Sequence, residues 1–531
     1  MSKPSKPYVR ESTGLVRELG GLEAFGIGFG QLNFIGGTAM DFMFATYLFM
    51  GASLALSALG ALVPCVLIGL VYWLFAISMP RSGGDYVYIS RVIHPAIGFM
   101  VSFFWCYLAV TWMGLIGWVV PTWTLPSFLG TYGLITNNAG MIALAEVVAS
   151  NTSAVIIGTI WIAAFTLLML LPIKNAMRVL IGLLIVSTIL FVPMVWLMAT
   201  TPVETFASNF NAVAAQYGTS YDAIIELAVK NDFVPGFSMA ATIGAINYAV
   251  MFNFGWTWPV YAGGEIKNIR KSIPVAIFSV ALLGCIAYFA VSSLLYYSAG
   301  FDFIGATAYL FNGFPQVYPL PREPTWFYLG SFMTKDPFTL LLIHLSMIVA
   351  SAAYKPTFIL LAVRSMFAWS FDRLAPEKLA DVSQKYTSPV TATVLCGVLG
   401  WVCLLVWIYT DWFAYESNQT LGMMICFVVV GIAGMVFPYT KKELFESSPQ
   451  IVKRRIAGIP TITIAGALAT IAAIYLTITG GPNFLGAISS SSIGIMVGVF
   501  LVPIILYYIS RAYRRTKGID IELSFKEIPP E

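Results

Sequence analysis

The sequence predicts an all-α integral membrane protein with twelve transmembrane helices, two of them broken near their middle. Of its 531 residues, 58% are hydrophobic and only 10% are charged, whereas soluble proteins carry about 25% charged residues. Twelve stretches are long and apolar enough to cross a bilayer, which takes about 20 such residues. Two of them, five spans apart, hold glycines and amide side chains at their centres, which weaken a helix where unpaired backbone groups are costly.

The predicted spans are joined mostly by short connections. They cover residues 22–49, 53–79, 95–125, 152–172, 177–200, 241–264, 274–300, 337–363, 389–409, 418–438, 459–479 and 491–510. A segment 1–21 precedes them and a tail 511–531 follows them. Two connections are long, 201–240 and 301–336, and we expect a short surface helix at 221–230 in the first.

Lysine and arginine are distributed unevenly between the two sides of the predicted membrane. Of the 29 Lys and Arg, all but four fall in segments on the same side as the first residue. The four exceptions are Lys230, Arg322, Lys335 and Lys355. The positive-inside rule then predicts that both termini are cytoplasmic, and the absence of an Arg- and Ser-rich leader favours the cell membrane over an organelle. No basic block resembles a nucleic-acid-binding arm, so nucleic acid is not an expected partner.

The first and sixth spans carry the candidate binding residues. Residues 25–37 read FGIGFGQLNFIGG, and Asn253-Phe254-Gly255-Trp256 lies at the centre of 241–264. Broken helices at matching places in two halves indicate a mid-membrane binding site, because opened backbone offers amides to an anion and carbonyls to a cation. The candidate substrate-binding residues are Gly30, Gln31, Leu32, Asn33, Phe252, Asn253, Phe254, Gly255 and Trp256. The alternatives are that the glycines only allow close packing and that the aromatics are core residues.

Three segments on the predicted cytoplasmic side carry motifs. Residues 80–88 read PRSGGDYVY, and residues 264–268 read GEIKN and are followed by Ile273-Pro274. Four residues repeat at a spacing of four before Pro389-Val390: Arg364, Ala368, Asp372 and Pro376. Together these segments resemble the amino acid–polyamine–organocation transporter superfamily over about residues 40–440. Two positions depart from its pattern: the Gly-Ser-Gly of its first helix reads Phe34-Ile35-Gly36 here, and Ile269 replaces a proline.

The resemblance implies a LeuT-like fold of two inverted five-helix repeats, 22–200 and 241–440, with 459–510 as two accessory helices. It implies a permease that moves amino acids by alternating access and needs no cofactor. The alternatives are sodium-coupled or exchange transport of a polyamine or organic cation, and a receptor that binds an amino acid without moving it. An enzyme is not expected, because the acidic and His residues of a metal site are not clustered in the predicted spans.

Lys355 is the sharpest candidate for ion coupling. An ammonium inside a span is costly and suggests a functional site. In sodium-coupled relatives a cation bridges helices one and eight, so we expect Lys355 to place its ammonium there, near the carbonyls of Phe29 and Gly30, and to exchange protons. Proton coupling is therefore preferred to sodium. The alternative is a lysine that snorkels to water.

Four further candidates complete the expected set. Thr357 is a hydroxyl at the same junction as Lys355, and Asp41 is a carboxylate of the outer vestibule or a proton site; packing and a structural carboxylate are the alternatives. A further group is expected to hold an inner gate closed, with solvated loop charges as the alternative. That group comprises Asp85, Glu265, Arg364 and Asp372.

Overall fold

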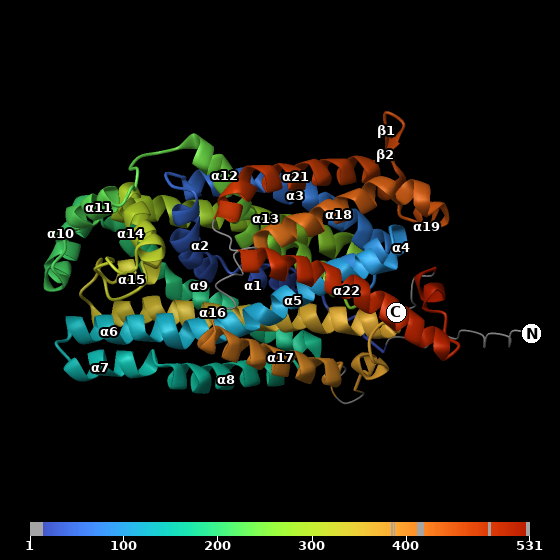
Figure 1. Ribbon diagram of the computed structural model, residues 1–531, viewed down its shortest axis with the longest axis horizontal. Coiled ribbons are helices and arrows are strands. Elements are labelled where there is room, and N and C mark those ends of the chain that lie inside the picture. The colour runs from blue at the N-terminus through green and yellow to red at the C-terminus, as the bar shows by residue number, and fades with distance from the viewer. Residues whose placement is uncertain (1–13, 384–385, 387, 411–418, 487–489, 527–531) are drawn as a thin grey trace, which may run out of the picture.

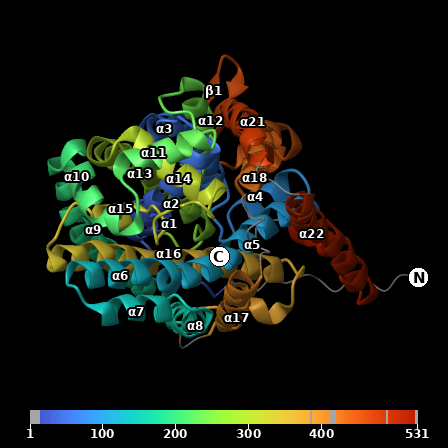
Figure 2. The same cartoon turned by 60° about the vertical axis from the view of Figure 1, so that its left-hand side comes forward.

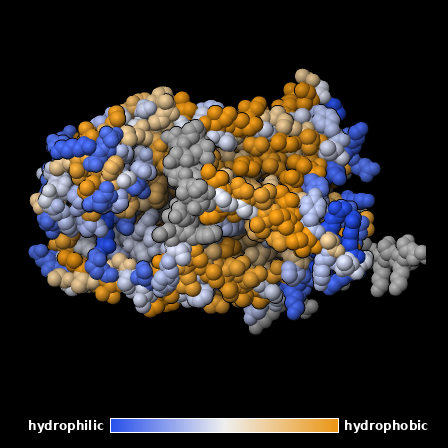
Figure 3. Space-filling model, in the orientation of Figure 1, coloured by the Kyte–Doolittle hydropathy of each residue, from blue (hydrophilic) through white to orange (hydrophobic). Residues whose placement is uncertain are grey.

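The computed structural model describes residues 14–383, 386, 388–410, 419–486 and 490–526. The start of the predicted segment 1–21, Lys385, the first residue of the predicted span 418–438 and the end of the tail 511–531 lie outside these residues. Within the described part, ten helices are long and apolar enough to cross a membrane. Hydrophilic residues gather at the two ends of the molecule and hydrophobic residues lie between them (Figure 3), so the chain is a multi-pass membrane protein.

The continuous helices account for ten of the predicted spans. They are α3 (Leu54–Ser78), α5 (Pro95–Val119) with its extension, α8 (Asn151–Leu168), α9 (Ile173–Thr200), α13 (Ile269–Ala299), α16 (Pro337–Phe371), α17 (Val390–Tyr409), α18 (Gln419–Thr440), α21 (Thr461–Gly486) and α22 (Ser490–Thr516). The third span is longer than predicted. It continues from α5 through the π-helical turn η1 (Val120–Thr124) into α6 (Leu125–Ile135), a run of 41 residues.

Two shorter helix pairs lie among the continuous helices. The first consists of α1 (Gly21–Leu32) and α2 (Phe34–Leu48), separated by one residue. The second consists of α12 (Met239–Phe252) and the 3₁₀ helix η3 (Phe254–Tyr261), again separated by one residue. α1 contacts η3, α13, α9 and α16, which places both interruptions inside the bundle (Figure 1).

Short helices cover one end of the bundle, which we call the outer end. They are α7 (Ala139–Val148), α10 (Val203–Ala214), η2 (Ala215–Tyr217), α11 (Tyr221–Lys230), α14 (Phe301–Gly313) and α15 (Trp326–Gly330). The expected helix at 221–230 is confirmed; the hydroxyl of Ser220 caps it by accepting from the amide of Ala223. α14 and α15 pack against α2, and Trp326 Nε1 donates to the carbonyl of Ile35 at 2.9 Å.

The opposite end carries the C-terminal segment, and we call it the inner end. Its short elements are α4 (Asp85–Val92), η4 (Glu377–Ala380), α19 (Lys442–Glu446), α20 (Gln450–Lys453), the strands β1 (Arg455–Ile456) and β2 (Ile459–Pro460), and η6 (Ile521–Phe525). β1 and β2 form a two-stranded antiparallel hairpin. α21 packs on α18 and α3, while α22 lies at the periphery along α5 (Figure 2).

Candidate functional site

The first interrupted helix breaks at Asn33. Its backbone is left-handed, with φ 33° and ψ 71°, a conformation that Asn adopts more readily than most residues. Asn33 Nδ2 donates to the carbonyl of Ala350 on α16, and Oδ1 accepts from the amide of Gly36 at 3.5 Å. The hydroxyl of Tyr354, also on α16, donates to the carbonyls of Leu32 and Asn33 at 3.4 and 3.3 Å. The Asn33 side chain and α16 therefore hold this break together.

This geometry corrects the expectation that the backbone opens around Gly30. α1 remains helical through Gly30 and ends at Leu32. The glycine fits a crowded contact, since a Cβ on Gly30 would lie 3.0 Å from a methyl carbon of Leu180 on α9. The packing alternative accounts for the geometry of Gly30, and Asn33 carries the break.

The second interrupted helix breaks at Asn253 and is built in a similar way. Asn253 Nδ2 donates to the carbonyl of Ala281 at 3.3 Å and to Cys285 Sγ at 3.2 Å, both on α13. The hydroxyl of Tyr288, on the same helix, donates to the carbonyl of Phe252 at 3.3 Å. At each break, then, an Asn amide bonds a carbonyl of one neighbouring helix, and a Tyr hydroxyl of that helix bonds a carbonyl next to the break.

The two interrupted helices touch through their backbones. A Cβ on Gly255 would lie 2.4 Å from the carbonyl oxygen of Gly28 and 2.7 Å from the amide nitrogen of Leu32. A Cβ on Gly284 of α13 would lie 2.4 Å from Asn253 Oδ1. Real side chains do not approach so closely, so glycine at 255 and 284 is what allows the two breaks to lie together.

Several buried polar atoms near the breaks have no hydrogen-bond partner among the described residues. They are Gln31 Nε2, Asn253 Oδ1, Trp256 Nε1 and Ser351 Oγ. Gln31 uses its other amide atom, since its Oε1 accepts from the Thr357 hydroxyl at 2.6 Å. Most buried polar groups in proteins are paired. These atoms therefore leave donors and an acceptor available for a small polar ligand.

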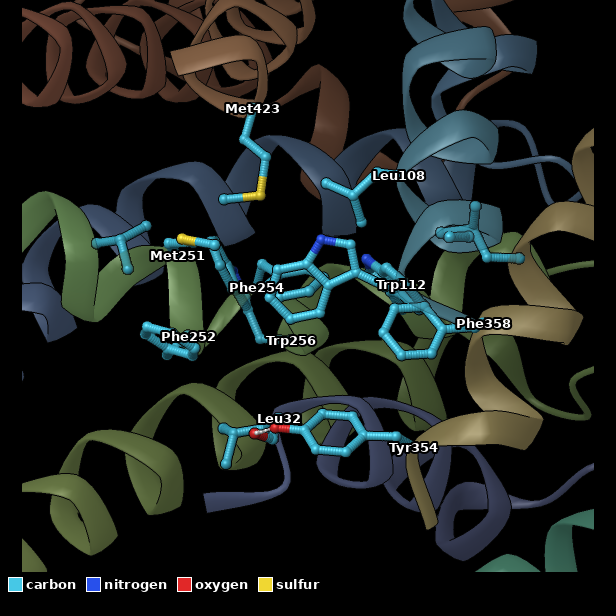
Figure 4. Packing of buried hydrophobic residues seen from close by; sticks show 14 of the residues in the cluster. Leu32, Leu108, Trp112, Met251, Phe252, Phe254, Trp256, Tyr354, Phe358 and Met423 are labelled. Carbon is cyan, nitrogen blue, oxygen red and sulfur yellow. Dashed lines mark hydrogen bonds between the residues drawn. The ribbon is translucent and has the colours of Figure 1, made fainter. Parts of the chain in front are cut away.

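Aromatic rings surround η3. Phe254 lies within ring contact of Trp105, Trp112 and Trp258, and Trp112 and Trp258 both contact Phe358 of α16. Figure 4 shows Phe254, Trp112 and Phe358 grouped above Leu32 and Tyr354. The sequence singled out Phe252, Phe254 and Trp256, all at most 3% exposed, but not the rings of α5 and α16 that complete this shell.

Lys355 is fully buried, but its neighbours differ from the expected ones. Its Nζ donates to the carbonyl of Met113 on α5, rather than to the carbonyls of Phe29 and Gly30. The reason is helical register: Thr357, two residues further on, is the residue that turns toward α1 and bonds Gln31. The snorkelling alternative is also wrong, because the side chain is 0% exposed. Within the described residues, the ammonium has no carboxylate partner.

Asp41 on α2 is also buried. It is 3% exposed, and its Oδ1 has no hydrogen-bond partner in the described part of the chain. Its electrostatic neighbours include the hydroxyls of Tyr248, Tyr288 and Tyr296. Because it is buried, the carboxyl does not line an open vestibule in this conformation.

Comparison with known families identifies the chain. A family model described as amino acid permease matches residues 19–505, a range that includes both interrupted helices and nearly the whole bundle. The chain belongs to the amino acid permease family. The resemblance read from the three motifs is thereby confirmed. A search of curated proteins returned no match.

At the inner end of the permease, two buried ion pairs hold three elements together. Arg364 of α16 binds both carboxylate oxygens of Glu265 at 2.7 Å. Arg91 of α4 binds Asp372, just beyond α16, at 2.7 Å. All four side chains are at most 3% exposed, so the alternative of solvated loop charges is wrong. Glu265, Arg364 and Asp372 were expected among the inner-gate residues without assigned partners. Arg91 was not expected there, because it lies 281 residues from Asp372 in the permease sequence.

Asp85 of the permease has tyrosine partners instead of a cation. Its carboxylate accepts from the hydroxyl of Tyr72 at 2.8 Å and from that of Tyr261. Burial raises the pKa of Asp85, and the two hydrogen bonds oppose that rise. Because Tyr72 lies on α3 and Tyr261 ends η3, the carboxyl joins α4 to the inner half of the second interrupted helix.

The N-terminal segment of the permease closes the same region. The amides of Glu18 and Leu19 both donate to the carbonyl of Glu265 at 3.0 Å, and the amide of Lys267 donates to the carbonyl of Leu19 at 2.8 Å. In the part of the chain that the structure describes, no group of three or more His, Cys, Asp and Glu is arranged to hold a metal ion.

Proposed function

We propose that this permease is a secondary active transporter that moves amino acids across the cell membrane by alternating access, with a proton as the coupling ion. The observation that carries the proposal is the meeting of two interrupted helices at Asn33 and Asn253, with unpartnered polar atoms beside both breaks. Broken helices at mid-membrane are a common way for transporters to expose backbone groups to a substrate.

The substrate chemistry follows from those atoms. Gln31 Nε2 is an amide donor suited to a carboxylate, and Asn253 Oδ1 is an acceptor suited to an ammonium. Backbone groups of Leu32 and Asn33 on one side and of Gly255 on the other supply further contacts, and Phe252, Phe254 and Trp256 exclude water. A small zwitterion matches this arrangement better than a purely cationic amine, because both a donor and an acceptor are unused.

The two interrupted pairs complete the topology. Counting α1–α2 and α12–η3 as one span each gives twelve spans together with the ten continuous helices. In our proposal they are the first and sixth helices of two inverted five-helix repeats. The inner end is then cytoplasmic, as the distribution of Lys and Arg predicts.

Alternating access requires each end to open in turn. The inner end is closed by the pairs Glu265–Arg364 and Arg91–Asp372, and α14 and α15 cover the outer half of the first interrupted helix. We infer that the structure represents an occluded conformation. Opening inward must separate Arg364 from Glu265, because α16 and the turn after η3 lie on opposite sides of that contact.

Lys355 supports proton coupling. Its amine joins α16 to α5 through a neutral carbonyl, so binding or losing a proton changes the charge at a helix contact within the bundle. Thr357 transmits such a change to α1 through its bond to Gln31. Asp41, a buried carboxyl with Tyr288 among its electrostatic neighbours, is a further candidate proton site.

Uptake by purified protein in proteoliposomes tests the proposal. A proton gradient directed inward, with the outside more acidic than the lumen, should drive accumulation of a labelled amino acid. A sodium gradient at constant pH should not. Lys355→Met should abolish the response to the pH gradient, while Lys335→Met, an exposed lysine of the outer end, should leave it unchanged. Unaltered pH-driven uptake in Lys355→Met would contradict proton coupling through this residue, and sodium-driven uptake would favour the alternative ion.

A further inference from the structure

A polar pocket of about 620 Å³ lies at the inner end, apart from the interrupted helices. Its walls come from α4, from the end of α18 with α19, and from the C-terminal segment that includes η6. The volume falls within the range of small-ligand sites, about 300–1,000 Å³. The pocket has no role in the transport mechanism proposed above.

The charge of this pocket is strongly positive. Lys441, Lys442 and Lys526 line it, and Glu443 is the one acidic residue of its lining. Within the described residues, none of the three lysine ammonium groups has an ion-pair partner. By contrast, three arginines of the neighbouring tail are paired: Arg511 and Arg515 with Glu522, and Arg514 with Glu377. The pocket therefore presents unpaired ammonium groups that are available to bind an anion.

Arg91 lines the pocket with a buried side chain. It is 3% exposed, and its Nε has no partner among the described residues although its other nitrogens bind Asp372 and Ser90. The guanidinium carbon of Arg91 lies 5.1 Å from the centroid of the Phe525 ring of η6. A donor that is unpaired, buried and lining the pocket is a second indication of a ligand, independent of the lysines.

The position indicates where the ligand comes from. Tyr439, in the last turn of α18, lines the pocket and is 62% exposed, as is typical of aromatic residues at the membrane–water boundary. Basic pockets between helices at this level are suited to anionic lipid head groups. A phosphate offers several oxygens to lysine and arginine donors at once.

We propose that this pocket binds the phosphate group of an anionic membrane lipid. The phosphate is held by Lys441 and Lys442 at the rim and reaches toward the free Nε of Arg91. Because Arg91 also binds Asp372, the bound group lies directly against the ion pair that joins α4 to the end of α16. Lipid binding then stabilises the inner end of the bundle.

Thermal unfolding of the full chain in nanodiscs tests this site. Wild-type protein should unfold at a higher temperature in phosphatidylcholine mixed with phosphatidylglycerol than in phosphatidylcholine alone, because the bound head group stabilises the folded state. The double variant Lys441→Gln/Lys442→Gln should lose this increase. The control Arg270→Gln/Lys271→Gln removes the same charge from an exposed part of the inner end outside the pocket and should keep it.

A third arm adds inorganic phosphate to protein in phosphatidylcholine nanodiscs. An increase only with phosphatidylglycerol supports a lipid site, whereas an equal increase with inorganic phosphate, also lost in the lysine variant, assigns the site to a soluble phosphate. The proposal is wrong if neither probe raises the unfolding temperature of wild type, or if the lysine variant responds as the control does. Amino acid uptake is not measured, so the result is independent of the proposed transport.

Discussion

Arg364 of α16 donates two hydrogen bonds of 2.7 Å, from Nε and Nη2, to the two carboxylate oxygens of Glu265 in the turn after η3. Both side chains are at most 3% exposed. The contact joins a continuous helix to the inner half of an interrupted one, and the carbonyl of the same glutamate receives the amides of Glu18 and Leu19. Glu265 is therefore the point where three segments of the inner end converge.

Glu265→Gln should destabilise the protein strongly. The change leaves the Arg364 guanidinium buried without a counter-charge, and breaking a buried ion pair costs about 3–5 kcal/mol. Unfolding in mixed detergent micelles measures the loss. Glu377→Gln is the matched control, because Glu377 pairs with Arg514 at an exposed site where such a pair contributes about 0–1 kcal/mol. Equal losses in the two variants would show that the Glu265 pair has no special weight.

The contribution of Asn33 to stability and transport can be separated into a backbone part and a side-chain part. Asn33→Gly keeps the left-handed backbone but loses the side-chain hydrogen bonds to Ala350 and Gly36. Asn33→Ala loses the same two bonds and in addition strains the left-handed backbone by about 1–2 kcal/mol. We expect both variants to transport poorly and Ala to be the less stable by about that amount in the same unfolding assay. If Ala and Gly are equally stable, the left-handed conformation at this position is not needed.

The hydroxyl of Thr357 should set substrate affinity through Gln31. Thr357→Val keeps the shape but removes the donor to Gln31 Oε1, so the amide is free to rotate and no longer presents Nε2 to the ligand. We expect the KM for the preferred amino acid to rise by about tenfold, equivalent to about 1.4 kcal/mol. Thr357→Ser retains the hydroxyl and should behave like wild type. An unchanged KM in the Val variant would show that Gln31 does not contact the substrate.

The outer cover, formed by α14, α15 and the segment that joins them, should become less stable as pH rises. Burial raises the pKa of Glu323, in the segment before α15, from its ordinary value of 4.5 to about 7, although the neighbouring Arg322 opposes the rise. A carboxyl with a raised pKa is protonated in the closed cover and ionised when exposed. The closed form is therefore most stable below pH 4.5 and loses stability as pH rises toward about 7.

Hydrogen exchange of the amides between α14 and α15 measures this effect. After correction for intrinsic rates, protection should be lower at about pH 8 than at about pH 5, and Glu323→Gln should remove most of the difference. Glu226→Gln, on the exposed face of α11, is the control. Protection that increases with pH in the wild type would contradict the predicted direction of the pH dependence.

The sequence predicted the broken helices because glycines and amides have local effects on winding. It did not show that the first break lies at Asn33, at the end of the candidate stretch, since the glycines of α1 are accommodated by packing against α9 and η3, which only the tertiary structure reveals. The helix at 221–230 was predicted correctly, and in the structure Ser220 caps it locally. The third span was cut short, since the continuation through a π-helical turn at Pro121 has no simple signal.

Long-range partners could not be predicted in this way. Arg91 finds Asp372 across 281 residues, and Lys355 finds Met113 across 242. The charged motifs of the inner end look alike in the sequence, and only the fold shows which of their side chains form buried pairs. The aromatic shell around η3 has the same origin, since the rings that complete it come from α5 and α16.

Counterflow in proteoliposomes tests the central claim most directly. Vesicles loaded with an unlabelled amino acid are diluted into a trace of the same labelled compound, with no ion gradient. If a substrate binds between the breaks at Asn33 and Asn253 and is carried across, label accumulates transiently in wild-type vesicles and not in Asn253→Ala vesicles. Stable binding of an amino acid without any counterflow would show a receptor, and would contradict transport.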